Sequence, residues 1–127
     1  MENRKFRPVL GIRIFTEDGK AFGPGIATLL RNVDRLHSLR AAAAEMGMAY
    51  SKAWRITKES EALLGFALLV SNAGGKNGGG AHLTPEAQSL LARYDAYTDA
   101  LRAASEVLFR EHFPQEDDPS EADAPSA

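Results

Sequence analysis

The sequence has 127 residues, no cysteine and a formal net charge of −2, and 44% of its residues are hydrophobic. This length fits one domain, and this composition excludes wholesale disorder, disulfides, cysteine nucleophiles and thiolate metal sites. No apolar run is long enough to span a membrane, and the N-terminus lacks the apolar core of a signal peptide, so we expect a cytoplasmic protein.

The charge is unevenly distributed along the chain. Residues 114–127 contain five acidic residues and no lysine or arginine, which leaves a net charge of +3 on residues 1–113. We predict that residues 1–113 form the folded domain and that 114–127 form a disordered acidic tail. A mildly basic domain is compatible with DNA binding, although many proteins with this charge bind no nucleic acid.

The N-terminal part predicts a hairpin followed by a helix. Residues 9–15 (VLGIRIF) alternate in the manner of a strand. Residues 17–20 (EDGK) are typical of a hairpin turn, with a short return strand at 21–22. Apolar residues then recur at amphipathic helical spacing between Pro24 and His37.

A helix-turn-helix is predicted next, over residues 38–64. Ser38 can cap a short alanine-rich helix at 39–46, and Gly47 can end it in the left-handed conformation. A second helix is expected at 49–64, and two helices joined by so short a turn must cross rather than lie antiparallel. An ordinary pair of core helices is the alternative.

The second helix has two kinds of surface. We place Trp54 on the core side, because a lone amphipathic aromatic on a helix usually packs; stacking on a base or sugar is the alternative. Arg55 suits a bidentate base contact, and Lys52 suits a phosphate. The residues of this region predicted to contact DNA carry hydrogen-bonding or cationic groups: Ser38, Tyr50, Ser51, Lys52, Arg55 and Lys58.

A glycine-rich hairpin follows this helix. Strands are expected at 66–71 and 81–83, joined by NAGGKNGGG at 72–80. This segment is not a phosphate-binding P-loop, because Lys76 is followed by Asn77 and the run lies within a hairpin. A hairpin in this place is typical of the wing of a winged helix, with Lys76 and Asn77 predicted to contact the DNA backbone. A tip that makes no contact is the alternative.

A long helix is predicted at 85–112. Thr84 and Pro85 are a strong helix start, and a helix of this length would span roughly 42 Å, which is more than a small domain covers by itself. Its apolar residues follow a heptad pattern, which predicts a homodimer. The predicted interface residues are Leu90, Tyr94, Tyr97, Leu101, Ala104 and Leu108.

Three segments together resemble a known family. FGPG (22–25), AAEMGMAYSKAW (43–54) and GGGAHLT (78–84) resemble the N-terminal DNA-binding domain of the ModE family of molybdate-dependent transcriptional regulators. The resemblance covers about residues 7–112, and LTPEAQSLL is also similar to the LysR type. It implies an α+β, mostly α, winged helix-turn-helix with an N-terminal β-hairpin and a long C-terminal dimerisation helix. It also implies operator binding by a homodimer that forms through the hairpin, the first helix and the last helix.

Two features depart from the family. Its sensing members carry C-terminal oxyanion-binding domains, whereas this chain ends at Ala127 after the acidic segment, so we expect no molybdate-sensing domain and no molybdate partner. Ala49 stands where the family has a serine at the entry of the second helix. The missing hydroxyl cap should loosen the first turn by about 1 kcal/mol.

Catalysis has no candidate in the sequence. His37, His82 and His112 are widely separated, no Ser-His-Asp grouping stands out, and we expect neither an enzyme nor a metal or other cofactor. The leading hypothesis is a homodimeric, sequence-specific DNA-binding transcriptional regulator. The alternative is a winged-helix protein-interaction module that does not bind DNA. A third, an oxyanion- or nucleotide-binding accessory, depends on the glycine run alone.

Overall fold

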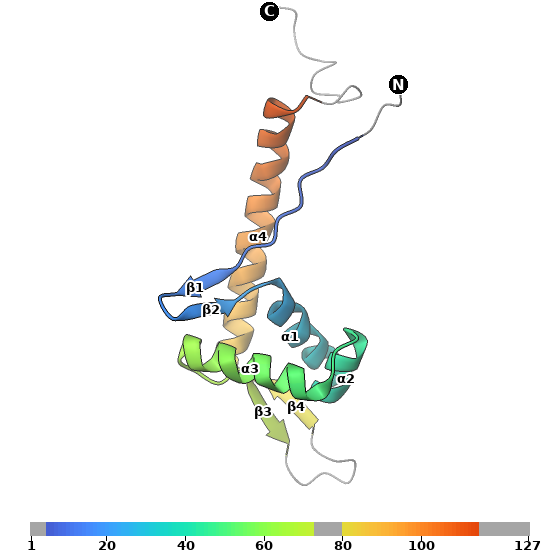
Figure 1. Ribbon diagram of the computed structural model, residues 1–127, viewed down its shortest axis with the longest axis vertical. Coiled ribbons are helices and arrows are strands. Elements are labelled where there is room, and N and C mark those ends of the chain that lie inside the picture. Colours follow the sequence, from blue (N-terminus) through green and yellow to red (C-terminus); the bar gives the residue numbers. More distant parts are fainter. Residues whose placement is uncertain (1–4, 73–79, 115–127) are drawn as a thin grey trace, which may run out of the picture. The chain divides into compact units, whose positions relative to one another are not determined.

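A computed structural model of the protein describes residues 5–72 and 80–114 (Figure 1). Its elements follow the order β1 (Ile14–Thr16), β2 (Gly19–Phe22), α1 (Pro24–Leu36), α2 (Leu39–Glu45), α3 (Tyr50–Leu64), β3 (Leu69–Asn72), β4 (Gly80–Leu83) and α4 (Pro85–His112). The described residues fall into two compact units: a larger one, 11–94, and a smaller one in which 5–10 join 95–114. The predicted mostly helical winged helix-turn-helix with a long last helix is confirmed.

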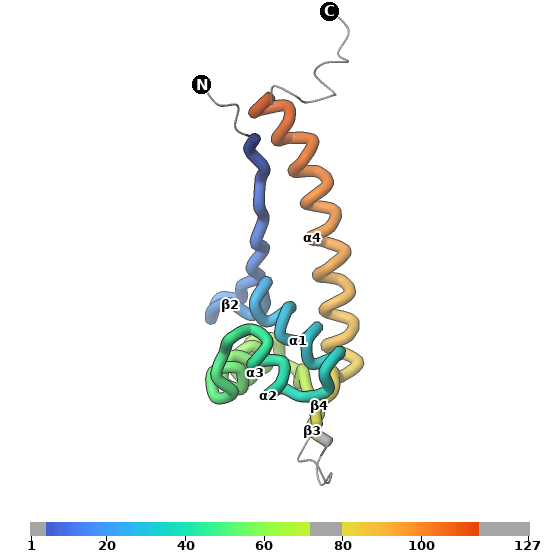
Figure 2. Tube along the Cα trace, turned by 90° about the vertical axis from the view of Figure 1, so that its right-hand side faces the viewer, coloured from blue at the N-terminus to red at the C-terminus, as the bar shows by residue number. Residues whose placement is uncertain are grey.

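The core of the larger unit is built around α1. This helix contacts α2, α3 and β4, and Figure 2 shows α1, α2 and α3 packed beside one another. Apolar side chains at helical spacing on α1 are buried, as the sequence predicted. The largest side chains that are completely enclosed are Phe22, Leu29, Leu30, Val33 and Leu68.

The two ends of α1 follow its local sequence. Pro24 occupies the first turn, where its missing N–H costs nothing. The helix ends at His37, which adopts the left-handed conformation (φ 58°). The His37 carbonyl then accepts a hydrogen bond of 3.0 Å from the backbone N–H of Ala81 in β4. The residue that follows α1 is therefore hydrogen-bonded to β4.

The helix-turn-helix forms as predicted. The Ser38 hydroxyl oxygen caps α2 by accepting a 3.0 Å hydrogen bond from the N–H of Ala41. Gly47 provides the positive φ (66°) between α2 and α3. Ala42 and Ala43 are fully buried, and their small side chains allow α2 to lie close to its neighbours.

The ends of α3 also agree with the sequence. Ala49 precedes the helix in an extended conformation and makes no side-chain cap, as the absence of a hydroxyl predicted. Gly65 ends the helix in the left-handed conformation (φ 87°).

The first hairpin has a shorter first strand and a longer return strand than predicted (Gly19–Phe22 against 21–22). β1 pairs antiparallel with β2 only from Ile14 to Thr16, whereas the sequence predicted a strand over 9–15. The return strand β2 has four residues, so the chain before Ile14 finds no pairing partner in it. Gly19 carries a positive φ (145°) next to the turn, as expected for this hairpin signal.

The second hairpin is the wing, which we define as β3 and β4. Leu69 pairs with Leu83 and Asn72 pairs with Gly80 in an antiparallel register. Thr84 then fastens the hairpin to α4: its hydroxyl donates to the Ala67 carbonyl (2.7 Å) and accepts from the Ala87 N–H (3.0 Å). The predicted start of the last helix at Thr84-Pro85 is confirmed.

The beginning of α4 belongs to the core of the larger unit. Tyr94 is buried, its ring meets Phe22 edge-on at 5.0 Å, and its hydroxyl donates a 2.6 Å hydrogen bond to the Ile12 carbonyl. Leu90 is partly buried and packs against the same core. The ring and the hydroxyl of Tyr94 are thus occupied within one chain, and its contact with a second copy stays a prediction.

The smaller unit contains no buried residue among those described, 5–10 and 95–114. Tyr97 and Leu108 keep 53% and 52% of their surface exposed, Ala104 is exposed, and Leu101 is half-buried. Within this unit Phe109 and Phe113 stack with ring centroids 5.0 Å apart. Among the helices of the described ranges, none is long and apolar enough to cross a bilayer.

Candidate nucleic-acid interface

The fully buried side chains of α3 are small or polar, and the partly buried Ile56 and Leu64 pack against the core beside them. Ala53, Thr57 and Ser60 are buried. The Thr57 hydroxyl donates to the Ala53 carbonyl at 2.8 Å, and the Ser60 hydroxyl donates to the carbonyl of Ala21 in β2. These short side chains let α3 lie close against β2, and both hydroxyls have partners, as buried polar groups require.

The outward side of α3 carries donors and cations. Ser51, Lys52 and Arg55 are exposed in its N-terminal half, where the sequence placed them. Arg55 lies 3.4 Å from Glu59 one turn later, and both side chains are about three-fifths exposed (59% and 62%). An ion pair this exposed contributes little free energy, so Arg55 can exchange Glu59 for another acceptor.

Trp54 lies on the outward side, which corrects the prediction that it anchors the core. Half of its surface (50%) is exposed. The physical reason is the close approach of α3 to β2: the positions that face the core are filled by Ala53, Thr57 and Ser60, and an indole has no room there. Trp54 is therefore available to a binding partner.

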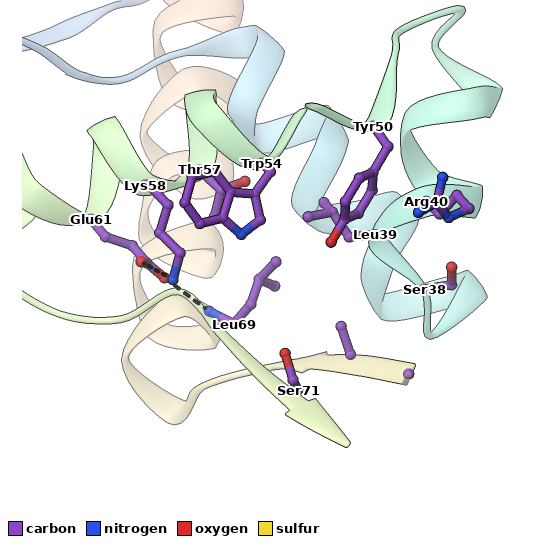
Figure 3. Close-up of a pocket in the computed structure, with 12 residues that line it drawn as sticks. Ser38, Leu39, Arg40, Tyr50, Trp54, Thr57, Lys58, Glu61, Leu69 and Ser71 are labelled. Atoms are coloured by element: carbon purple, nitrogen blue, oxygen red, sulfur yellow. Dashed lines mark hydrogen bonds and ion pairs between the residues drawn. The ribbon is translucent and has the colours of Figure 1, made fainter. Parts of the chain in front are cut away.

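Trp54 borders a groove between α3 and the wing (Figure 3). The groove has a volume of about 450 Å³ and lies wholly within the larger unit. Figure 3 shows Tyr50, Trp54 and Lys58 projecting from α3 toward β3. The other contributors come from the start of α2, from α3 and from the wing: Ser38, Leu39, Arg40, Thr57, Glu61, Leu69, Ser71, Gly80 and Ala81.

Two cation–aromatic pairs line this groove. The Arg40 guanidinium carbon lies 4.3 Å from the centre of the Tyr50 ring, and the Lys58 ammonium lies 5.7 Å from the centre of the Trp54 ring. Both distances are within the range of cation–π attraction. Sequence reasoning missed the position of Arg40 and the outward position of Trp54 on this groove. The available signal was the i, i+4, i+8 spacing of Tyr50, Trp54 and Lys58, which places all three along one side of a helix.

Glu61 connects α3 to the start of the wing. One of its carboxylate oxygens accepts from the backbone N–H groups of Leu68 (2.7 Å) and Leu69 (3.4 Å). The other lies 3.2 Å from the Lys58 ammonium. The Glu61 side chain is only 13% exposed and that of Lys58 is 52% exposed, so the carboxylate is enclosed while the ammonium stays accessible.

Three further residues were predicted to contact DNA: Ser38, Lys76 and Asn77. Ser38 lies on the groove, and its oxygen caps α2 while its hydroxyl hydrogen can still be donated. Lys76 and Asn77 lie outside the described residues. Within 5–72 and 80–114, no group of three or more histidine, aspartate and glutamate side chains is placed to hold a metal ion.

Comparisons with known proteins agree with this geometry. The family model described as "Bacterial regulatory helix-turn-helix protein, lysR family" matches residues 27–88, from α1 to the start of α4. The chain is 36% identical over 83 residues to the molybdenum-pterin-binding protein MopB of Rhodobacter capsulatus, which covers 65% of this chain and 31% of that protein. It is 33% identical over 91 residues to the transcriptional regulator ModE of Haemophilus influenzae, covering 72% of this chain and 36% of that one.

A further relative is the DNA-binding transcriptional dual regulator ModE of Escherichia coli K12. It is 33% identical over 85 residues, covering 67% of this chain and 32% of the regulator. The chain spans about a third of the length of the curated relatives that it matches. Residues 27–88 therefore form a bacterial regulatory helix-turn-helix domain of the LysR type, within a region that is similar to ModE regulators over 67–72% of this chain.

Proposed function

We propose that the protein is a sequence-specific DNA-binding transcriptional regulator with α3 as its recognition helix. The observation that carries this proposal is the division of α3 into a buried side of small residues and an outward side that presents Ser51, Lys52 and Arg55. Donors and cations near the start of a protruding helix suit the major groove of DNA. The names of the ModE relatives support the same function.

Within this proposal the outward side chains have separate roles. The Arg55 guanidinium releases Glu59 and donates hydrogen bonds to two acceptor atoms of a guanine. The Lys52 ammonium contacts a phosphate. Lys76 and Asn77, between the strands of the wing, contact the backbone without reading bases. Under these assignments Arg55 contributes to sequence specificity, whereas Lys52, Lys76 and Asn77 contribute only to affinity.

The test is selection of a preferred duplex from random sequences, followed by fluorescence-polarisation titrations across salt concentrations. Replacing Arg55→Ala should cost about 1–3 kcal/mol on the selected duplex and relax the preference at one base pair. Arg102→Ala is the matched control, because Arg102 is an exposed cation on α4 that pairs with Asp99. Failure to bind any duplex at low salt would favour the alternative, a winged-helix protein-interaction module.

We also propose that the regulator acts as a homodimer through the later part of α4. The support is that no described residue of the chain after Tyr94 is buried, although Tyr97, Leu101, Ala104 and Leu108 continue the heptad pattern. Burying a leucine stabilises an interface by roughly 1.5–3 kcal/mol. A two-fold dimer presents two recognition helices, so the operator should be an inverted repeat with half-sites about 34–36 Å apart, or a multiple of that.

Sedimentation of a charged variant tests the dimer. Leu108→Asp changes a side chain that is half exposed in one chain, so it should yield a folded monomer that binds an inverted repeat weakly. Ala103→Asp is the control, because Ala103 is also exposed but lies off the heptad seam. A wild-type protein that sediments as a monomer at micromolar concentration, or a Leu108→Asp variant that stays dimeric, would contradict the proposed interface.

Molybdate is not among the partners that we propose for this chain. A ligand that binds only the native state raises its stability by mass action, so a thermal-shift titration is sufficient. We expect no shift at low millimolar molybdate, and a saturable increase in melting temperature would add molybdate to the partners.

A further inference from the structure

We propose that the groove between α3 and the wing holds a stretch of the DNA sugar–phosphate backbone, with Trp54 and Arg40 as contact residues. This inference rests on the proposed function and assigns a role to residues that the base-reading surface leaves unused. The chemistry that the groove recognises is a phosphate ester next to an apolar sugar face.

The charges of the groove favour an anionic occupant. Its lining contains Arg40 and Lys58 as cations and Glu61 as the one anion among the described lining residues. The Glu61 oxygens already face Lys58 and the backbone N–H groups of Leu68 and Leu69, so this carboxylate repels a phosphate less than an open one would. Arginine, lysine and serine side chains are among the groups that contact phosphates in protein–DNA complexes, and Ser38 and Ser71 also line the groove.

The aromatic side chains add an apolar surface of a size that suits deoxyribose. Trp54 is 50% exposed and Tyr50 is 38% exposed, and both project into the groove beside the cations (Figure 3). The Arg40 guanidinium lies over the Tyr50 ring, and this cation–π contact favours a position of the arginine beside the groove before a ligand arrives. Phosphates flank each sugar along a strand, and in the groove Lys58 and Arg40 flank the two aromatic rings (Figure 3).

The position of the groove agrees with the shape of duplex DNA. A backbone strand separates the major groove from the neighbouring minor groove. With α3 in the major groove, we expect the strand at the edge of that groove to run between α3 and the wing, where the lining residues lie. Contacts there should strengthen binding to every duplex and should not select a sequence.

The single tryptophan provides a direct measurement. Trp54 is the only tryptophan of the chain, so intrinsic emission reports on this groove alone. The full chain is titrated with a random-sequence duplex while Trp54 emission and the polarisation of a labelled duplex are followed in parallel. We expect both signals to saturate at the same DNA concentration and both to weaken with salt. Inorganic phosphate and a deoxynucleoside monophosphate, each titrated alone, should leave the emission unchanged.

A charge variant gives the second measurement. Arg40→Gln should weaken binding to all duplexes about equally and lower the salt slope by about 1. Arg102→Gln removes a cation that does not line the groove and should leave the slope unchanged. Circular dichroism melts of both variants verify that each is folded.

The outcomes separate this inference from the proposed function. Duplex binding by polarisation with constant Trp54 emission and an unchanged Arg40→Gln slope would overturn the groove assignment and leave DNA binding intact. A saturable emission change with phosphate or the mononucleotide that no duplex displaces would make the groove a small-anion site instead. An absence of duplex binding at every salt concentration would refute the function and the groove together.

Discussion

α1 and α3 contribute to the same core, yet they place their large side chains on opposite sides. α1 encloses its bulky aliphatic residues: Ile26, Leu29, Leu30 and Val33. α3 encloses Ala53, Thr57 and Ser60 and leaves Tyr50 and Trp54 at the surface. Most of the apolar burial that these two helices contribute comes from α1, whereas α3 directs its largest groups outward.

We therefore expect stability of the larger unit to depend mainly on α1 and binding mainly on the outward side of α3. Substitutions of buried apolar residues on α1 should lower the free energy of unfolding. Substitutions of outward residues on α3 should change binding while the free energy of unfolding stays nearly constant. Each expectation below tests one side of this division.

The largest effect is expected for Leu30→Ala in α1. Leu30 is fully buried, so the variant loses apolar burial and leaves a cavity, at a cost of about 2–5 kcal/mol in the free energy of unfolding. Urea denaturation measures this loss. Leu10→Ala, at an exposed position outside the proposed dimer interface, is the control and should cost clearly less. A cost below about 1 kcal/mol for Leu30→Ala would contradict the central role of α1.

A smaller loss is expected for Ser60→Ala on the buried side of α3. The variant removes the donor to the Ala21 carbonyl, and an unsatisfied buried acceptor costs about 1–3 kcal/mol. Ser51→Ala is the matched control, because Ser51 is exposed on the same helix. Equal denaturation midpoints for the two variants would show that the hydroxyl of Ser60 does not help to hold α3 against β2.

A gain is expected for Ala49→Ser at the entry of α3. Ala49 makes no side-chain cap, and a serine oxygen there can accept a backbone N–H of the first turn, which is worth about 1 kcal/mol. Differential scanning calorimetry should record a higher melting temperature. The control Ala62→Ser, in the exposed later part of α3, should give no gain, because serine is a poorer helix former than alanine.

The smallest change in stability is expected for Trp54→Ala. Surface substitutions usually alter the free energy of unfolding by less than about 0.5 kcal/mol, and Trp54 is half exposed. Urea denaturation followed by circular dichroism gives the value. A loss above about 2 kcal/mol in the free energy of unfolding would show that Trp54 stabilises the core, which would contradict the contrast between α1 and α3.

Most of the fold could be predicted from the sequence because its signals are local. Ser38, Gly47, Gly65 and Thr84 mark helix ends through hydrogen bonds or backbone conformations that involve neighbouring residues. The helical spacing of apolar residues on α1 likewise needs no knowledge of the rest of the chain.

The errors concern residues whose partners are distant in the sequence. The Ser60 hydroxyl meets Ala21, and the Tyr94 hydroxyl meets Ile12, so neither role can be deduced from nearby residues. Trp54 was assigned to the wrong side because its position on a helical wheel borders both faces. The close packing of α3 on β2 places Trp54 on the outward side, and that packing depends on the fold as a whole.

The two strands of the wing are each fastened to a different helix. Glu61 in α3 binds the backbone where β3 begins, and the carbonyl of His37, after α1, binds Ala81 in β4. Neither attachment involves the segment that joins the strands. Because each strand is held by a different helix, a displacement of α1 or of α3 would carry one strand of the wing with it.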